Sequence, residues 1–135
     1  MRLVEGRTEQ EGRVEICTAN TWGTICHHGW DTIDARVVCL QLGYTVAGSY
    51  YYTLERAESL THIISAGAVA RRSAFYGQGS GPFKLSFVAC TGNERRLGDC
   101  PSGSLSHRYS SSRCNSHSYD VGVSCMLKTG NSRCM

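Results

Sequence analysis

Residues 26–43 read CHHGWDTIDARVVCLQLG, and this stretch predicts the centre of the fold. Asp31 or Thr32 can cap the start of a helix here, and Gly43 can end it. The apolar residues between these ends follow helical spacing: Ile33, Val37, Val38, Leu40 and Leu42. Because Cys39 lies on the same segment, we expect a helix that is bonded to another element of the domain.

Three other segments alternate apolar and polar residues: GRVEICTA (12–19), PFKLSFVAC (82–90) and DVGVSC (120–125). Such alternation predicts short strands with one buried face. Strands joined to a helix by cysteines predict an α+β fold class. We therefore expect a small disulfide-rich domain in which a curved antiparallel sheet cradles the helix.

The length of 135 residues fits one domain with a single core. We expect this domain to span residues 1–135, with its core at 2–125, a long insertion at about 45–74 and a C-terminal tail at 126–135. The insertion has no cysteine and contains a tyrosine triplet, and we expect a second helix near 53–64. Long insertions in compact domains are often functional.

The chain contains eight cysteines: Cys17, Cys26, Cys39, Cys90, Cys100, Cys114, Cys125 and Cys134. This even and high number predicts four disulfides and an oxidising compartment. A zinc-thiolate scaffold is disfavoured, because no CxxC pair occurs and the cysteines are scattered along the chain. No apolar run approaches the roughly 20 residues of a membrane-spanning helix, so we expect no span.

Charge is distributed unevenly along the chain, although the net charge is only +3. Residues 1–58 carry five Arg against eight Asp and Glu, whereas residues 59–135 carry nine Lys and Arg against three acidic residues. Twelve of the 14 basic residues are Arg, whose planar guanidinium binds sulfate, phosphate and carboxylate with two hydrogen bonds. An anionic ligand and a merely hydrated basic surface both explain this pattern.

A series of short motifs follows one another in a fixed order: RLVEG, EGRVEI, WGTIC, GWD, DARVVCLQLGY, YGQGSGP, VAC, DC and DVGVSC. This succession resembles the scavenger receptor cysteine-rich domain over residues 2–125. The resemblance implies a curved sheet cradling a helix, in agreement with the periodicities. It also implies an extracellular location, as a secreted protein or the ectodomain of a receptor, and membership of a larger protein.

The resemblance is to the six-cysteine group of that family, because Tyr44 stands where the eight-cysteine group has a cysteine. It implies three bridges: Cys26–Cys114, Cys39–Cys125 and Cys90–Cys100. Cys17 and Cys134 lie outside the family pattern, and we expect them to pair by elimination.

The histidines of CHHGWD mark a departure from the cation-binding members of the family. Those members have two aspartates at the positions of His27 and His28 and a glutamate at that of Tyr119, so the resemblance implies that this calcium cage is absent. The expected Cys26–Cys114 bridge brings both histidines near His117. Three imidazoles suit zinc, nickel or copper, whereas a pH-responsive surface and plainly hydrated histidines are the alternatives.

A second cation site of the family draws on acids at the positions of Asp31 and Asp34 and on an asparagine where this chain has Arg113. We expect Arg113 to lie against one of these aspartates and to replace the ion with its own charge.

The resemblance implies a ligand-binding module for polyanions or microbial surface molecules. Our candidate ligand-binding residues are two arginine pairs and two weaker candidates: Arg71, Arg72, Arg95, Arg96, Arg13 and Arg108. The alternative is a protein-interaction domain, or an ancillary domain of a larger receptor or secreted enzyme, that uses the tyrosine-rich insertion. No recognisable nucleophile and base accompany the serines and histidines, so we expect no catalysis, no cofactor and no nucleic-acid partner.

Overall fold

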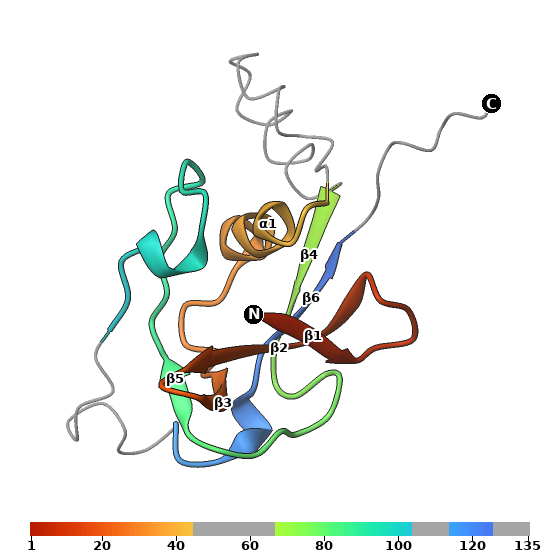
Figure 1. Ribbon diagram of the computed structural model, residues 1–135, viewed down its shortest axis with the longest axis vertical. Helices are drawn as coiled ribbons and strands as arrows, with labels where there is room; N and C mark the ends of the chain where they lie inside the picture. Colours follow the sequence, from red (N-terminus) through yellow and green to blue (C-terminus); the bar gives the residue numbers. More distant parts are fainter. Residues whose placement is uncertain (45–66, 104–113, 126–135) are drawn as a thin grey trace.

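The computed structural model describes residues 1–44, 67–103 and 114–125. In these ranges a curled sheet lies against one α-helix, which confirms the predicted α+β class (Figure 1). In chain order the elements are β1 (Arg2–Glu5), β2 (Glu11–Thr18), β3 (Thr21–Ile25), α1 (Thr32–Gln41), β4 (Ala68–Arg71), β5 (Phe83–Leu85), the 3₁₀ turns η2 (Leu97–Asp99) and η3 (His117–Tyr119), and β6 (Gly122–Cys125).

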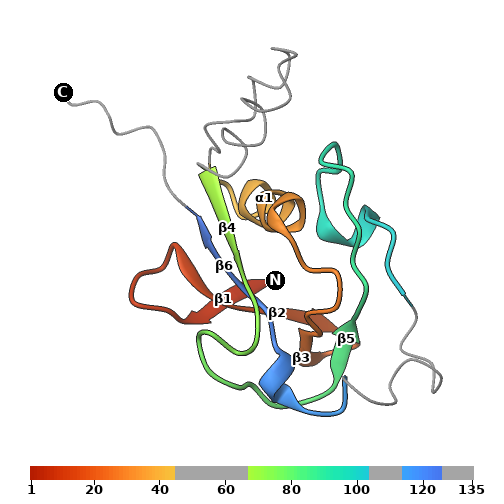
Figure 2. The same cartoon turned by 180° about the vertical axis from the view of Figure 1, so that it is seen from behind.

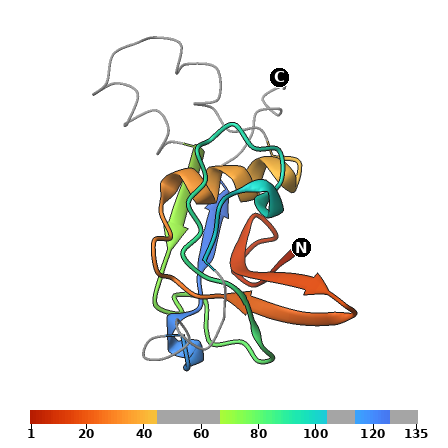
Figure 3. The same cartoon turned by 90° about the vertical axis from the view of Figure 1, so that its left-hand side faces the viewer.

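Strand β2 lies at the centre of the sheet, whose strand order is β4-β6-β2-β3-β5, with β1 also paired to β2. The sheet is strongly curved: Figure 3 shows α1 across the upper ends of β4 and β6, while β2 and β3 run away from them at a steep angle. All pairs are antiparallel except β3 with β5, which departs from the predicted antiparallel sheet. The long connection between these two strands, which passes through α1 and β4, permits a parallel crossover.

Helix α1 begins and ends where its capping residues predicted. Asp31 Oδ1 accepts a hydrogen bond from Asp34 N at 3.1 Å, and Asp34 Oδ2 accepts one from Asp31 N at 2.9 Å, which is a reciprocal capping box. Gly43 follows the helix with φ 98°, a left-handed conformation that favours glycine. Val37 and Val38 are fully buried, because β4 and β6 cover this face of the helix.

The three disulfides that the resemblance implied are present, as Cys26–Cys114, Cys39–Cys125 and Cys90–Cys100. The second of these ties α1 to β6. Cys17 carries an exposed free thiol among the described residues, and Cys134 lies outside them. Pairing of Cys17 with Cys134 therefore stays a prediction.

The polar face of β2 is buried, whereas its alternation predicted that only the apolar face would be. Glu11, Arg13 and Glu15 are each 6% exposed. Arg13 Nη1 lies 2.8 Å from Glu5 Oε1, and Arg13 Nη2 lies 3.1 Å from Glu15 Oε2. Arg13 also donates to the carbonyl of Gly77 at 3.2 Å. The ligand-binding role expected of Arg13 stays a prediction, for a guanidinium that the protein's own acceptors enclose.

The expected insertion at about 45–74 ends earlier than predicted. Strand β4 falls inside that range and pairs along its whole length with β6. Its sequence, AVAR, consists mostly of small residues and does not clearly alternate apolar with polar positions. Pairing with β6 is therefore what makes this segment a strand. Residues 45–66, with the tyrosine triplet and the expected helix at 53–64, lie outside the described part, as does the tail 126–135. In the described ranges no helix is both long and apolar enough to span a membrane.

Candidate functional site

The first candidate surface is the loop of residues 90–100, called here the Arg95 loop, which the Cys90–Cys100 disulfide closes. Inside the loop, the Glu94 carboxylate accepts hydrogen bonds from the N–H groups of Thr91 at 2.9 Å and Gly92 at 3.0 Å. The bond from Thr91 is the largest cause that lowers the pKa of Glu94. The loop is therefore ordered by its own backbone as well as by the crosslink.

Side chains of α1 fix the position of the Arg95 loop. The hydrogen bonds between them are Cys90 N to Asp34 Oδ1 at 2.8 Å, Leu97 N to Gln41 Oε1 at 2.7 Å and Arg36 Nη1 to Gly92 O at 3.0 Å. Leu97 is also buried in the core, 3% exposed. The loop is thus held to the helix at two positions near its start and at one position near its end.

Asp34 couples the start of α1 to the Arg95 loop, because its two carboxylate oxygens accept from Asp31 N and Cys90 N. Burial raises the pKa of Asp34 to about 7, although both backbone donors oppose the shift. Asp31 and Asp34 are the positions for which the family resemblance implied a second cation site. Here their oxygens bind backbone N–H groups, and the expected partner, Arg113, lies outside the described residues.

Arg95 and Arg96, which are candidate ligand-binding residues from the sequence, are exposed on the Arg95 loop. Arg96 Nη2 lies 3.6 Å from Asp99 Oδ1, and the two side chains are 71% and 49% exposed. An ion pair that is so solvated stabilises the protein little. Both guanidinium groups can therefore turn towards a ligand at low cost.

The second candidate surface surrounds residues 72–77, called here the Phe75 turn. The Arg71 guanidinium carbon lies 4.3 Å from the centroid of the Phe75 ring, whereas Arg72 Nη2 donates to the carbonyl of His27 at 3.3 Å. Neighbouring side chains at the end of a strand point to opposite faces. These two arginines therefore have different surroundings and do not form a single cluster.

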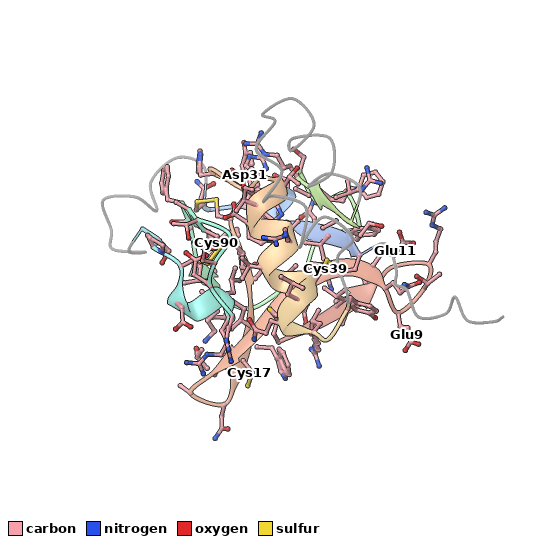
Figure 4. All side chains as sticks on the ribbon, turned by 90° about the horizontal axis from the view of Figure 1, so that it is seen from above. Glu9, Glu11, Cys17, Asp31, Cys39 and Cys90 are labelled. Carbon is pink, nitrogen blue, oxygen red and sulfur yellow. A yellow bond between two sulfur atoms is a disulfide. The ribbon has the colours of Figure 1, made fainter. Side chains whose placement is uncertain are left out.

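The two arginine pairs lie on opposite sides of the molecule. In Figures 1 and 2, α1 separates β4 from the Arg95 loop. Figure 4 shows the same division from above, with Cys90 on one side of α1 and Glu11 on the other. The Phe75 turn belongs to the Glu11 side, because Tyr76 Oη donates to Glu11 Oε1 at 3.0 Å. The last candidate, Arg108, lies outside the described residues.

The three histidines predicted to converge on a metal have separate partners. His27 Nδ1 accepts from Ser73 N at 3.1 Å, and the His27 ring meets Tyr119 edge to face. His28 stacks on Phe87 with ring centroids 4.9 Å apart. The rings of His27 and His28 meet edge to face with centroids 5.8 Å apart, and each histidine has a further partner of its own.

His117 is engaged through both ring nitrogens. Its Nδ1 lies 3.0 Å from Asp120 Oδ1, and its Nε2 lies 2.9 Å from the carbonyl of Gly81. Asp120 is buried and also accepts from Gly79 N at 2.7 Å. His117 therefore joins η3 to the glycine-rich segment before β5.

In the described ranges, two groups of three potential metal ligands come together: Cys26, His28 and Cys114, and Cys90, Glu94 and Cys100. Each group contains both sulfurs of a disulfide, and a bridged sulfur is not a thiolate ligand. The predicted set of His27, His28 and His117 is not among them. The zinc hypothesis has no geometric support in this part of the chain.

A hollow that was not predicted from the sequence lies beside the Phe75 turn. This hollow measures about 430 Å³ and is lined by Glu5, Arg7, Phe75 and Tyr76. Burial raises the pKa of Tyr76, and its hydrogen bond to Glu11 adds to the shift. The hollow arises because the turn after β4 lies over the end of β1, a contact between segments about 70 positions apart. The only local signal was an apolar Phe75 shortly after two arginines in a segment expected to be a loop.

The chain matches the family described as the scavenger receptor cysteine-rich domain over residues 4–126. A scavenger receptor cysteine-rich domain superfamily protein of Patiria pectinifera is 38% identical over 125 residues, which are 93% of this chain and 9% of that protein. The chain therefore spans less than a tenth of the length of this relative.

Two solved structures share both fold and sequence with the chain. The third such domain of murine neurotrypsin superposes with a TM-score of 0.67 at 38% identity, over 94% of this chain and 96% of that one. The dimeric form of the domain of mouse MARCO superposes with a TM-score of 0.60 at 33% identity, over 93% of this chain and 94% of that one. The chain belongs to the scavenger receptor cysteine-rich family, whose domains are ligand-binding modules within larger proteins.

Proposed function

We propose that the domain is an extracellular, non-catalytic module that recognises polyanionic or microbial surface ligands through its exposed arginines. The Arg95 loop carries this proposal, because it presents Arg95 and Arg96 to solvent on a segment closed by a disulfide. Guanidinium groups bind sulfate, phosphate and carboxylate with directed, charge-assisted hydrogen bonds. The loop thus combines the right donor chemistry with a fixed position.

Anchoring of the Arg95 loop favours binding because little backbone freedom remains to be lost. Its three hydrogen bonds to α1 are already made without a ligand. Binding then orders mainly the two arginine side chains, at about 0.5–1.5 kcal/mol each. A mobile loop with the same two residues would lose backbone freedom as well.

The Arg71–Arg72 pair adds a second, weaker surface on the other side of α1. Arg72 already donates to a carbonyl and Arg71 already stacks on Phe75, so both are engaged within the protein. A short anion contacts one surface only. A long polymer that reaches both gains affinity through the raised effective concentration of its second contact.

The disulfides support an extracellular setting, because such bonds persist in oxidising compartments. The relative from Patiria pectinifera is far longer than this chain. We therefore place the domain within a larger secreted protein or receptor, where repeated modules multiply weak contacts.

Heparin binding measured by surface plasmon resonance tests the proposal. We expect Arg95→Ala/Arg96→Ala to weaken binding by about tenfold or more, which is at least about 1.4 kcal/mol, and Arg71→Ala/Arg72→Ala to weaken it less. A suitable control is Lys84→Ala/Lys128→Ala, which removes the two lysines of the chain and changes the net charge equally.

Binding of the wild type should also fall steeply with salt, because the Debye length shrinks from about 10 Å at 0.1 M to about 3 Å at 1 M. The proposal fails if the wild type does not bind heparin. It also fails if the lysine control loses as much affinity as the Arg95 double variant, since net charge alone then explains binding.

A further inference from the structure

The hollow beside the Phe75 turn has the size of a small-ligand site. Its volume is about 430 Å³, and its walls come from the end of β1 and from the turn after β4. Binding pockets for small molecules range from roughly 300 to 1,000 Å³. One six-membered sugar ring is a suitable occupant of a space at the lower end of that range.

One wall of the hollow is aromatic. Phe75 is 56% exposed, more than Trp22 and Phe87, the other exposed large apolar side chains in the described part of the chain. Tyr76 meets it edge to face with ring centroids 4.9 Å apart, and the Arg71 guanidinium lies over the Phe75 ring. Phe75 is thus held as a flat apolar surface beside a positive charge.

The polar walls offer both an acceptor and a donor. The Glu5 side chain is 60% exposed, and its Oε1 is held by Arg13 at 2.8 Å. The Arg7 side chain is 86% exposed, and its Nε is held by Glu11 at 2.9 Å. These ion pairs fix both side chains while leaving most of their surface open to a ligand.

The walls are formed before any ligand arrives. Ser73 and Ala74 have φ of 56° and 54°, and Glu5 has φ of 66°, so three residues that are not glycine adopt left-handed backbone. Such conformations persist only where surrounding contacts impose them, and they gather at binding sites. Here Ala74 N donates to the Asp120 carbonyl at 2.8 Å, and Gly77 N donates to the Ala74 carbonyl at 2.8 Å.

We propose that this hollow binds one pyranose residue that carries a carboxylate or a sulfate group. The C–H face of the ring packs on Phe75, a hydroxyl donates to Glu5, and the anionic group accepts from Arg7. Arg7 lines the hollow and Arg71 stacks on its Phe75 wall, whereas Glu5 is the one carboxylate of the lining, so charge favours an acidic sugar over a neutral one. The inference rests on the proposed function and specifies its polyanion as an acidic polysaccharide.

Isothermal titration with three tetrasaccharides tests this site. One probe alternates N-acetylglucosamine with glucuronate, the second is its sulfated form, and the third contains neutral N-acetylglucosamine alone. We expect the wild type to bind at least one acidic probe about tenfold more tightly than the neutral one. Comparison of the first two probes shows whether carboxylate or sulfate is preferred.

Variants of the wall separate the hollow from the rest of the surface. Phe75→Ala should weaken binding of the acidic probe by about tenfold or more. Phe75→Tyr should retain this affinity because the aromatic ring remains. Phe87→Ala is the matched control, since Phe87 is also exposed, at 41%, but stacks on His28. Arg7→Gln, at a solvent-exposed side chain, should remove the preference for acidic over neutral probes.

Several results would overturn the site. Equal affinity for acidic and neutral probes, or unchanged affinity in Phe75→Ala, excludes it, and a preference that survives Arg7→Gln excludes the role of that arginine. If Arg95→Ala/Arg96→Ala abolishes tetrasaccharide binding, the sugar site lies on the Arg95 loop and not in the hollow, whereas the proposed function of polyanion binding is retained. Conversely, tetrasaccharide binding without any heparin binding retains the hollow and refutes the proposed function.

Discussion

The Arg95 loop contains two adjacent arginines and the Phe75 turn begins at the second of another such pair, yet the structure uses the two pairs differently. Arg95 and Arg96 are exposed on a loop that a disulfide closes. Arg71 and Arg72 stand at the end of β4, where one stacks on Phe75 and the other donates to the His27 carbonyl. A loop crosslinked at its base thus leaves paired arginines free, whereas a strand end directs them to opposite faces and to partners within the protein.

The two regions also differ in what holds them. The Arg95 loop depends on a covalent bond and on hydrogen bonds to α1. The Phe75 turn lies over buried ion pairs of β2 and contains left-handed residues that are not glycine. Stability should therefore respond to different substitutions on the two sides.

The largest effect is expected under the Phe75 turn, for Arg13→Met. This change keeps the volume of the side chain but removes the charge shared by Glu5 and Glu15, and breaking a buried ion pair costs about 3–5 kcal/mol. Urea unfolding measures the loss. Arg2→Met is the control, because Arg2 also pairs with Glu15 but is 47% exposed and should cost about 1 kcal/mol or less. Equal losses in both variants would contradict the distinction.

In the Arg95 loop, Cys90→Ser/Cys100→Ser should cost about 3 kcal/mol, the entropy-model value for so short a loop. The loop then gains freedom, so heparin affinity should fall while binding of the acidic tetrasaccharide at the Phe75 turn stays unchanged. Thermal unfolding and both binding assays measure these outcomes on one preparation. Wild-type heparin affinity in this variant would show that the crosslink does not pre-organise Arg95 and Arg96.

A smaller effect is expected where Asp34 joins α1 to the Arg95 loop. Asp34→Asn leaves a backbone N–H of Asp31 or Cys90 without its carboxylate acceptor, at a cost of about 1–3 kcal/mol. Because the pKa of Asp34 is raised to about 7, its stabilising contribution is full below the unfolded pKa of about 3.9 and is lost as pH rises through about 7.

The stability of the wild type relative to Asp34→Asn should therefore be greater at pH 5 than at pH 8, as measured by urea unfolding at both values. Glu94→Gln serves as the comparison within the same loop, because backbone donors lower the pKa of Glu94. The stability of the wild type relative to Glu94→Gln should therefore decrease as the pH falls into the acid range. A stability difference for Asp34→Asn that is constant from pH 5 to pH 8 would contradict the raised pKa.

The smallest effect is expected for Ala74→Gly in the Phe75 turn. Glycine removes the steric cost of φ 54° but adds conformational freedom to the unfolded chain. The two effects should together raise the free energy of unfolding by about 1 kcal/mol or less. Ala89→Gly is the matched control, as it adds the same freedom at an exposed position without positive φ. If Ala74→Gly lowers the free energy of unfolding as much as the control does, the backbone of the turn is not strained at Ala74.

Local patterns predicted the elements that local interactions specify. The capping aspartate, the apolar stripe and Gly43 sufficed for α1, because each acts within a turn of its own position. Strand β4 was missed, since AVAR becomes a strand only beside β6. Likewise the charged residues of β2 were expected to face water, and only the cover from β1 and the loop after β4 explains why they are buried.

Sequence by itself determined the fold class, the helix and its caps, and, through the family resemblance, the three observed disulfides, one of which encloses Arg95 and Arg96. Tertiary structure alone decided that Arg13 is enclosed, that His27, His28 and His117 have separate partners, and that Glu5, Arg7, Phe75 and Tyr76 share a hollow. The physical reason is range. Caps, periodicity and crosslinks between cysteines are carried by residue type and spacing, whereas burial and convergence depend on which distant segments the curved sheet brings into contact.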